Sequence, residues 1–193
     1  MESNQHEPRR GDRIQAGGGV RSTKPLQNSN QLTKPRRGDR KTMASTLVKI
    51  DVHLIFHVKS TSIKLQNNHL PDIFAYLGGI IKNIGGLPIV VGGRPDHIHI
   101  LTTLPKTMSM ADFARAVKAD SSKWIRKIAP CYQDFAWQEG YGAFSVSPTL
   151  IAKTTQYIQH QEEHHRKRSF QEEYKLFLEA YGIKYDERFA FGD

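Results

Sequence analysis

Two histidines, His97 and His99, flank Ile98 in a segment whose apolar pattern predicts a β-strand over residues 97–104. Because side chains alternate along a strand, both imidazoles are expected on one exposed face, with Ile98 on the face that packs against helices. Two neighbouring imidazoles are a partial ligand set for a divalent metal. Asp96, directly before the pair, is a candidate to accept an imidazole N–H, although it also suits a turn.

A second candidate pair, Tyr157 and Gln161, lies on a predicted helix over residues 150–165. Side chains four residues apart share one face of a helix. The glutamine carbonyl suits Mg²⁺ or Mn²⁺, and an activated phenol can attack phosphorus to form a covalent intermediate. If this face meets the His pair, the site suits metal-assisted phosphoryl transfer, with Tyr141 as the next candidate nucleophile. In the alternative interpretation, Tyr157 packs under the sheet and Gln161 is solvated.

The elements that must position these residues follow from apolar spacing and turn residues. Strands are predicted over residues 47–59, 87–91, 97–104 and 143–147, and helices over 70–84, 109–128, 150–165 and from 169 to Gly182. This order predicts an α+β fold, a ferredoxin-like split βαβ sandwich whose sheet is antiparallel. Both long helices are expected on one face of that sheet. Two helices are appended at the C-terminus, and the first of them carries the candidate nucleophile.

The charge of the chain is concentrated in its N-terminal segment. The chain has 193 residues and a formal net charge of +9. Residues 1–42 contribute +6 of this charge, which leaves +3 for residues 43–193. The segment has few large apolar residues, so we expect a basic disordered extension before a single domain at 43–193. The repeated Pro-Arg-Arg-Gly-Asp-Arg indicates either DNA-binding arms or upstream DNA read in frame, with Met43 as a candidate start.

The composition also excludes several classes of protein. The only cysteine, Cys131, excludes a disulfide framework and a cysteine-built zinc site. No apolar run approaches the roughly 18 residues that span a bilayer, and no secretory signal is present, so we expect a cytoplasmic, DNA-associated protein. His160 and His164 are four residues apart but do not form the zinc-protease pattern. Their roles, and those of His53 and His57, are left open.

Six segments together resemble a known family. They are Leu77–Lys82, Gly93–Leu101, Lys118–Trp124, Trp137–Ser147, Tyr157-Ile-x-x-Gln161 and Tyr185–Arg188. In this order they resemble the single-tyrosine HUH transposases of the TnpA type, which small prokaryotic insertion sequences encode. The resemblance extends from about Val48 to Phe191, and the N-terminal extension is the part that departs from the family pattern.

The resemblance implies a role for each candidate residue. His97 and His99 match the two metal-binding histidines, Gln161 matches the third ligand, and Tyr157 matches the nucleophile. Mg²⁺ or Mn²⁺ is the implied cofactor, with no small-molecule cofactor. The tyrosine would cleave single-stranded DNA, become linked to the 5′-phosphate and release a 3′-OH that can later rejoin strands. Family members act as homodimers, in which the tyrosine helix can serve the partner's His pair, and they recognise subterminal DNA hairpins.

Basic side chains near these elements are candidate DNA contacts: Lys59, Arg94, Arg115, Lys118 and His165. Transposition is the expected role of this chemistry. One alternative is the same chemistry in a domesticated REP-associated relative or in a replication or plasmid nickase. Another is a non-catalytic ferredoxin-like nucleic-acid-binding protein, for which Tyr157 would be dispensable.

Overall fold

The computed structural model describes residues 47–161, 163 and 169–187, all within the compact unit Ser45–Asp193. The expected extension at 1–42 and the candidate start Met43 lie outside the described residues. None of the helices in the described part has the length and apolarity needed to cross a bilayer.

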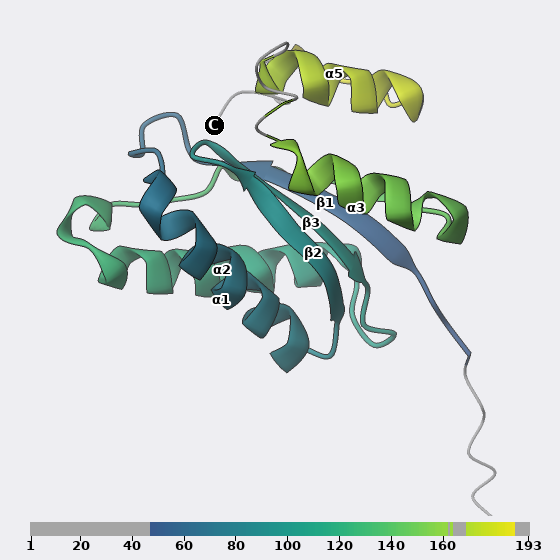
Figure 1. Ribbon diagram of the computed structural model, residues 1–193, viewed down its shortest axis with the longest axis horizontal. Helices are drawn as coiled ribbons and strands as arrows, with labels where there is room; N and C mark the ends of the chain where they lie inside the picture. Colours follow the sequence, from purple (N-terminus) through teal and green to yellow (C-terminus); the bar gives the residue numbers. More distant parts are fainter. Residues whose placement is uncertain (1–46, 162, 164–168, 188–193) are drawn as a thin grey trace, which may run out of the picture. The chain divides into compact units, whose positions relative to one another are not determined.

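Four strands form one sheet in the order β2-β3-β1-β4, and every neighbouring pair is antiparallel (Figure 1). The strands are β1 (Asp51–His57), β2 (Leu87–Arg94), β3 (His97–Thr103) and β4 (Gly142–Ser145). The helices are α1 (Leu70–Asn83), α2 (Met110–Ile128), α3 (Ile151–Gln159) and α5 (Phe170–Ala180), with 3₁₀ turns η1 (Asn67–His69), η2 (Pro130–Tyr132) and η3 (Pro148–Leu150). This architecture confirms the predicted α+β sandwich, a split βαβ arrangement with appended helices.

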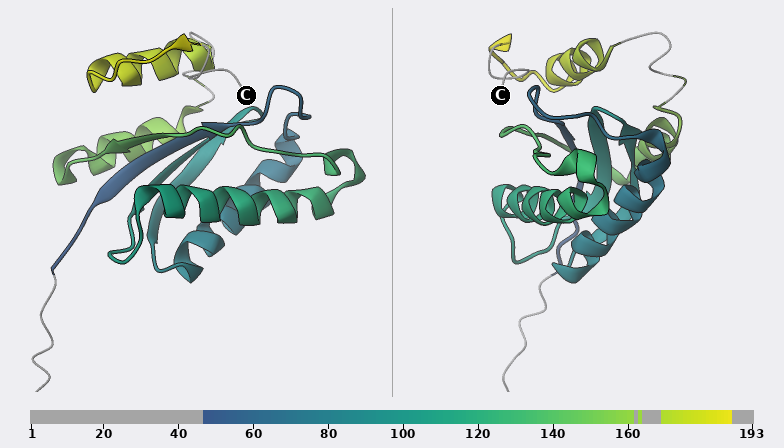
Figure 2. Two further views of the ribbon diagram at one scale, coloured as in Figure 1. Left: turned by 180° about the vertical axis from the view of Figure 1, so that it is seen from behind. Right: turned by 90° about the vertical axis from the view of Figure 1, so that its left-hand side faces the viewer.

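The helices α1 and α2 cover one face of the sheet, as predicted, and build the main core there (Figure 2). Alternate residues of the two central strands, including Leu54, Phe56, Ile98 and Ile100, point into this core. The buried stripes of the helices meet them, with Ile73, Leu77 and Ile81 from α1 and Phe113, Val117 and Ile125 from α2. This face is almost wholly apolar.

The opposite face is covered by the two C-terminal helices (Figures 1 and 2). On α3, Ile158 packs with Leu101 and Val146. On α5, Tyr174 and Leu178 pack with strand residues in a second small cluster. The sheet is therefore buried on both sides, and its second face is a layer between the strands and α3 and α5.

Two glycines allow these helices to approach the sheet closely. A Cβ at Gly92 of β2 would lie 2.8 Å from the backbone oxygen of Ile158 in α3. A Cβ at Gly142 of β4 would lie 2.5 Å from the hydroxyl of Tyr174 in α5. A side chain at either position would push its helix outward, so these glycines set the depth at which the functional helices lie.

The largest differences from the predicted boundaries occur in three elements. The first strand covers 51–57 rather than 47–59, because its pairing with β3 ends at Asp51 and Thr103. The second strand continues to Arg94, three residues past its predicted end, which leaves Pro95 and Asp96 as the turn before β3. The helix predicted over 150–165 ends at Gln159. There, the His160 ring bonds to the carbonyl of Gln156 at 2.7 Å, which satisfies an acceptor of the last turn.

Candidate active site

His97 and His99 lie side by side on one face of β3, with Ile98 on the other, as the strand period predicts. Their rings are 5.0 Å apart between centroids. The expected exposure of this face was wrong, since His97 is 0% and His99 1% exposed. The reason is that α3 and α5 cover the face that a bare ferredoxin-like sandwich would leave open.

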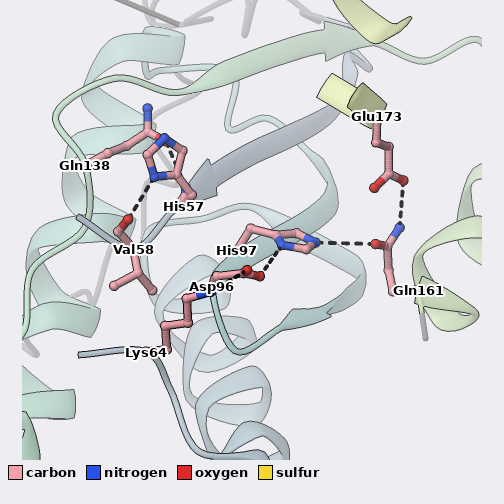
Figure 3. A network of polar contacts seen from close by, with 8 residues as sticks. All are labelled: His57, Val58, Lys64, Asp96, His97, Gln138, Gln161 and Glu173. Atoms are coloured by element: carbon pink, nitrogen blue, oxygen red, sulfur yellow. Dashed lines mark hydrogen bonds and ion pairs between the residues drawn. The ribbon is translucent and has the colours of Figure 1, made fainter. Parts of the chain in front are cut away.

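Asp96 contacts the imidazole of His97 (Figure 3). Its Oδ1 lies 2.7 Å from Nδ1 of His97, and Lys64 Nζ lies 3.2 Å from the other carboxylate oxygen. The hydrogen bond with His97, together with the charge of Lys64, holds the pKa of Asp96 well below its usual range. The candidate role for Asp96 thus has a geometric basis, because an ionised carboxylate fixes His97 with Nδ1 toward Asp96 and Nε2 toward the site.

His53 of β1, to which the sequence assigned no role, holds the second imidazole. Its Nε2 lies 2.9 Å from Nδ1 of His99. Burial lowers the pKa of His53 to about 3, so this ring is neutral at neutral pH. Both site histidines are therefore held through Nδ1, and Nε2 is the atom that each would present to a metal.

Gln161 is also buried, with 2% of its surface exposed, so it is not the solvated residue of the alternative interpretation. Its Oε1 lies 3.4 Å from Nε2 of His97 (Figure 3). Its amide nitrogen donates to Glu173 Oε1 at 3.4 Å and to the Tyr157 carbonyl at 3.5 Å. The amide oxygen thus faces the His pair and the amide nitrogen faces away from it.

Tyr157 of α3 reaches the same place. Its half-buried ring stands edge-on to His99 at 5.7 Å and to His53 at 6.1 Å between centroids. Phe177 of α5 contacts it from the other side at 5.6 Å. The structure therefore brings Tyr157 to the His pair, whereas Tyr141, the second candidate nucleophile, lines a groove along α2 on the opposite side of the sheet.

Glu173 of α5 is a site residue that the sequence analysis missed. Its carboxylate and the ring nitrogens of His97 and His99 offer ligand atoms that all lie within 4.8 Å of one another. It is 8% exposed, and burial raises the pKa of its carboxyl to about 7. A signal was present, because Glu173 interrupts the apolar stripe of α5 that Phe170, Tyr174 and Phe177 form.

The candidate DNA contacts do not form one surface. Arg94 lines a pocket with Gln159 and Gln161, next to the site. In contrast, Arg115 and Lys118 line the groove along α2.

The two candidate contacts on α2, Arg115 and Lys118, already have partners within the chain. Arg115 pairs with Asp112 at 2.6 Å. The ammonium of Lys118 donates to the carbonyls of Glu139 and Gly140 at 2.7 and 2.9 Å, and burial lowers its pKa to about 8. Lys59 is half-buried, with its backbone N–H bonded to Ala136, and His165 lies outside the described residues.

Two further histidines are not among the candidate ligands, although His57 is paired with His97 in the register of β1 and β3. The ring of His57 bonds to the Val58 carbonyl at 2.8 Å, while Gln138 accepts from the His57 backbone N–H at 3.0 Å (Figure 3). His160 is exposed at the end of α3. The expected pair of His160 with His164 is not described, since His164 lies outside the described residues.

The donor set fits a hard divalent cation. It offers two imidazole nitrogens, one amide oxygen and one carboxylate within a small buried space. Oxygen and imidazole ligands in this proportion suit Mg²⁺ or Mn²⁺ better than a metal that selects thiolates. In general, a phenol beside a divalent ion is a group that can act as a nucleophile on phosphorus.

Comparisons with known proteins give a match to one protein family. The model of the family described as transposase IS200 like matches residues 46–161. No curated protein matches the sequence significantly. The match runs from just before β1 to Gln161, and so includes His53, the His pair and α3.

Two of the solved structures that match this chain are described as transposases. A candidate transposase from Deinococcus radiodurans R1 has a TM-score of 0.48 and 23% identity, over 61% of this chain and 94% of that one. A REP-associated tyrosine transposase bound to a REP hairpin has a TM-score of 0.47 and 12% identity, over 62% of this chain and 71% of that one. Since the family match covers more than half of its residues, the chain belongs to the IS200-like transposases.

Proposed function

We propose that this transposase is a metal-dependent single-stranded DNA transesterase that uses Tyr157 as its nucleophile. The observation that carries the proposal is the meeting of two elements from distant parts of the chain. From one short stretch of the C-terminal segment, Tyr157 faces His99 and Gln161 contacts His97. This arrangement supports a phosphoryl-transfer site, because the nucleophile and the ligands share one buried layer.

The reaction conserves the number of phosphodiester bonds. The oxygen of Tyr157 attacks phosphorus and forms a tyrosine–phosphate ester, and the bond from phosphorus to the 3′-oxygen breaks. The phenolic proton is lost, and the leaving 3′-oxygen takes up a proton to become a 3′-OH. A 3′-OH of another strand reverses these steps and displaces the tyrosine, so no external energy source is needed.

The residues around Tyr157 prepare this step. His97, His99 and Gln161 would hold a bound Mg²⁺ or Mn²⁺, which would polarise the phosphate and offset its developing charge. Asp96 and His53 orient the two imidazoles. Phe177 packs against the phenol and restricts its rotation.

The test is formation of a covalent protein–DNA adduct. Labelled single-stranded DNA from the flanks of the gene, incubated with the protein and Mn²⁺, is expected to give an SDS-resistant adduct. Tyr157→Phe should lower the yield by roughly a thousandfold or more, because the attacking oxygen is removed while the ring still packs. Tyr141→Phe is the matched control and should leave the adduct intact. An adduct that persists in Tyr157→Phe would exclude Tyr157 as the nucleophile.

Metal dependence has a separate readout. Chelation with EDTA and the His97→Ala substitution should each abolish the adduct, and only the chelated protein should recover when Mn²⁺ is returned. DNA binding that continues without any adduct under every condition would instead support a non-catalytic nucleic-acid-binding protein.

We extend the proposal to a homodimer that acts on strands with subterminal hairpins, as the family resemblance implies. Light scattering during gel filtration measures the oligomeric state, and a hairpin-containing strand should be cleaved in preference to a scrambled one. In the arrangement described above, Tyr157 faces the His pair of its own chain. Mixing Tyr157→Phe with His97→Ala protein tests exchange, since an adduct would then require one subunit's tyrosine at the other subunit's metal.

A further inference from the structure

We propose that Glu173 is a direct ligand of the divalent metal and supplies the negative charge that the other ligands lack. The inference rests on the proposed function, because it adds a fourth residue to the same site. It also goes beyond the resemblance, which assigns the site two histidines and one glutamine, all of them neutral ligands.

The first argument for Glu173 as a ligand is its position. Ligand atoms of Glu173, His97 and His99 lie within 4.8 Å of one another. Ligands at about 2.1 Å from Mg²⁺ are separated by about 3 Å when adjacent and about 4.2 Å when opposite. The ligand atoms are thus close enough that side-chain rotations alone would bring all three onto one ion.

The second argument for Glu173 as a ligand is the balance of charge at the site. Two imidazoles and an amide oxygen would leave a buried dication without a charged ligand, because the Asp96 carboxylate contacts His97 on its far nitrogen and is also paired with Lys64. Glu173 is itself 8% exposed, and the same helix stacks the ring of Phe170 on His97 at 4.5 Å between centroids, which keeps water from this side of the site. A carboxylate in these surroundings and a divalent cation each lower the cost of burying the other.

The contact with Gln161 suggests how the two C-terminal ligands cooperate. Glu173 Oε1 accepts the amide N–H of Gln161 at 3.4 Å, which turns the amide oxygen toward His97 (Figure 3). One carboxylate oxygen can thus orient Gln161 while the other binds the ion. A purely orienting role is the competing explanation, and it predicts that Glu173 matters only when Gln161 is present.

The experiment measures Mn²⁺ binding to the full chain, freed of metal with EDTA and without DNA, by calorimetry. Glu173→Gln, which keeps the shape of the side chain, should weaken Mn²⁺ binding about tenfold or more. Glu179→Gln removes the same charge from an exposed position of the same helix and should bind as the wild type does. Thermal melts of both variants establish that α5 remains packed.

A double substitution separates ligation from orientation. If Glu173 is a ligand, adding Glu173→Gln to Gln161→Ala should weaken Mn²⁺ binding about tenfold again. If the second substitution has no further effect, or if Glu173→Gln alone binds normally, the proposal is overturned. His97→Ala distinguishes this failure from failure of the proposed function, because unchanged binding in that variant would remove the metal site as a whole.

Discussion

The two faces of the central strand β3 have opposite chemistry. Toward α1 and α2 it presents Ile98 and Ile100, which are fully buried in the main apolar core. Toward α3 and α5 it presents His97 and His99, which are just as deeply buried but contact Asp96, His53 and the C-terminal residues. One strand of seven residues therefore serves stability on one side and the candidate chemistry on the other.

The comparison shows that burial affects the free energy of folding in opposite ways on the two faces of the sheet. On the core face, the burial of apolar groups provides the free energy of folding. On the site face, the burial of polar groups costs free energy unless each group is held by a partner or a ligand. Substitutions on the two faces should consequently separate into losses of stability and losses of activity.

The largest expected effect on stability belongs to the core face. Ile98→Ala should lower the free energy of unfolding by about 2–5 kcal/mol, because it opens a cavity beneath α1 and α2. Urea denaturation measures this change. Ile89→Ala is the matched control on β2, where the side chain is 40% exposed, and it should cost under about 1 kcal/mol. Similar losses for both variants would contradict the division between the faces.

The next effect concerns the depth of α3. Gly92→Ala should slow adduct formation by about a hundredfold, because the new Cβ would push Ile158, and with it Tyr157, away from the His pair. Gly78→Ala is the control, since nothing lies within 4 Å of a Cβ at that position in α1. The measurement is the rate of adduct formation per folded protein. Equal rates for the two variants would show that the position of α3 is not limiting.

A smaller expected effect is the change in the free energy of unfolding with pH. His53 has a folded pKa of about 3, so below its unfolded value of about 6.5 the unfolded chain binds the proton more readily. Its contribution to stability is therefore complete above about pH 6.5 and is lost as the pH falls toward 3, by about 2 kcal/mol at pH 5. Urea denaturation of EDTA-treated protein at pH 7.5 and 5 should show this loss as the difference between wild type and His53→Asn, because Glu173, with a pKa raised to about 7, gains stability over the same range in both proteins. His53→Asn should lack that component, and an identical pH dependence in both proteins would refute it.

The smallest effect concerns the helix that carries Glu173. Ser169 and Glu172 form a capping box at the start of α5. Ser169→Ala should destabilise α5 by about 1 kcal/mol, and hydrogen exchange should show earlier opening of this helix than of α1 or α2. Ser147→Ala removes a serine whose side chain caps no backbone N–H, and it should leave α5 unchanged. Uniform opening of all helices in Ser169→Ala would contradict a separately stabilised site layer.

Much of the division between the core face and the site face of the sheet can be predicted from the spacing of side chains along each element. The alternation around His97-Ile98-His99 assigned the two imidazoles to one face, and three/four spacing placed α1 and α2. The four-residue spacing of Tyr157 and Gln161 predicted a shared direction, and both reach the site although α3 ends before Gln161. Such patterns are visible because they depend only on the period of one element.

Pattern did not predict the residues whose roles depend on contacts between distant elements. His53 stayed unassigned because its partner His99 lies 46 positions away, on another strand. Glu173 was missed because its place beside the His pair depends on how α5 folds back over the sheet. Lys118 was a candidate DNA contact, yet its ammonium donates to two carbonyls of the segment before β4. None of these contacts follows from a regular spacing of residues in the sequence.

The sequence by itself determined the order of the elements, the apolar core and the two candidate pairs of site residues, since each follows from side-chain spacing along a single strand or helix. Only the tertiary structure decided that the His pair is buried, that His53 and Asp96 hold it, and that Glu173 joins it. The physical reason is that α3 and α5 cover a sheet face that the strands alone would leave in water. Once water is excluded there, each polar group must find its partner across the fold rather than along the chain.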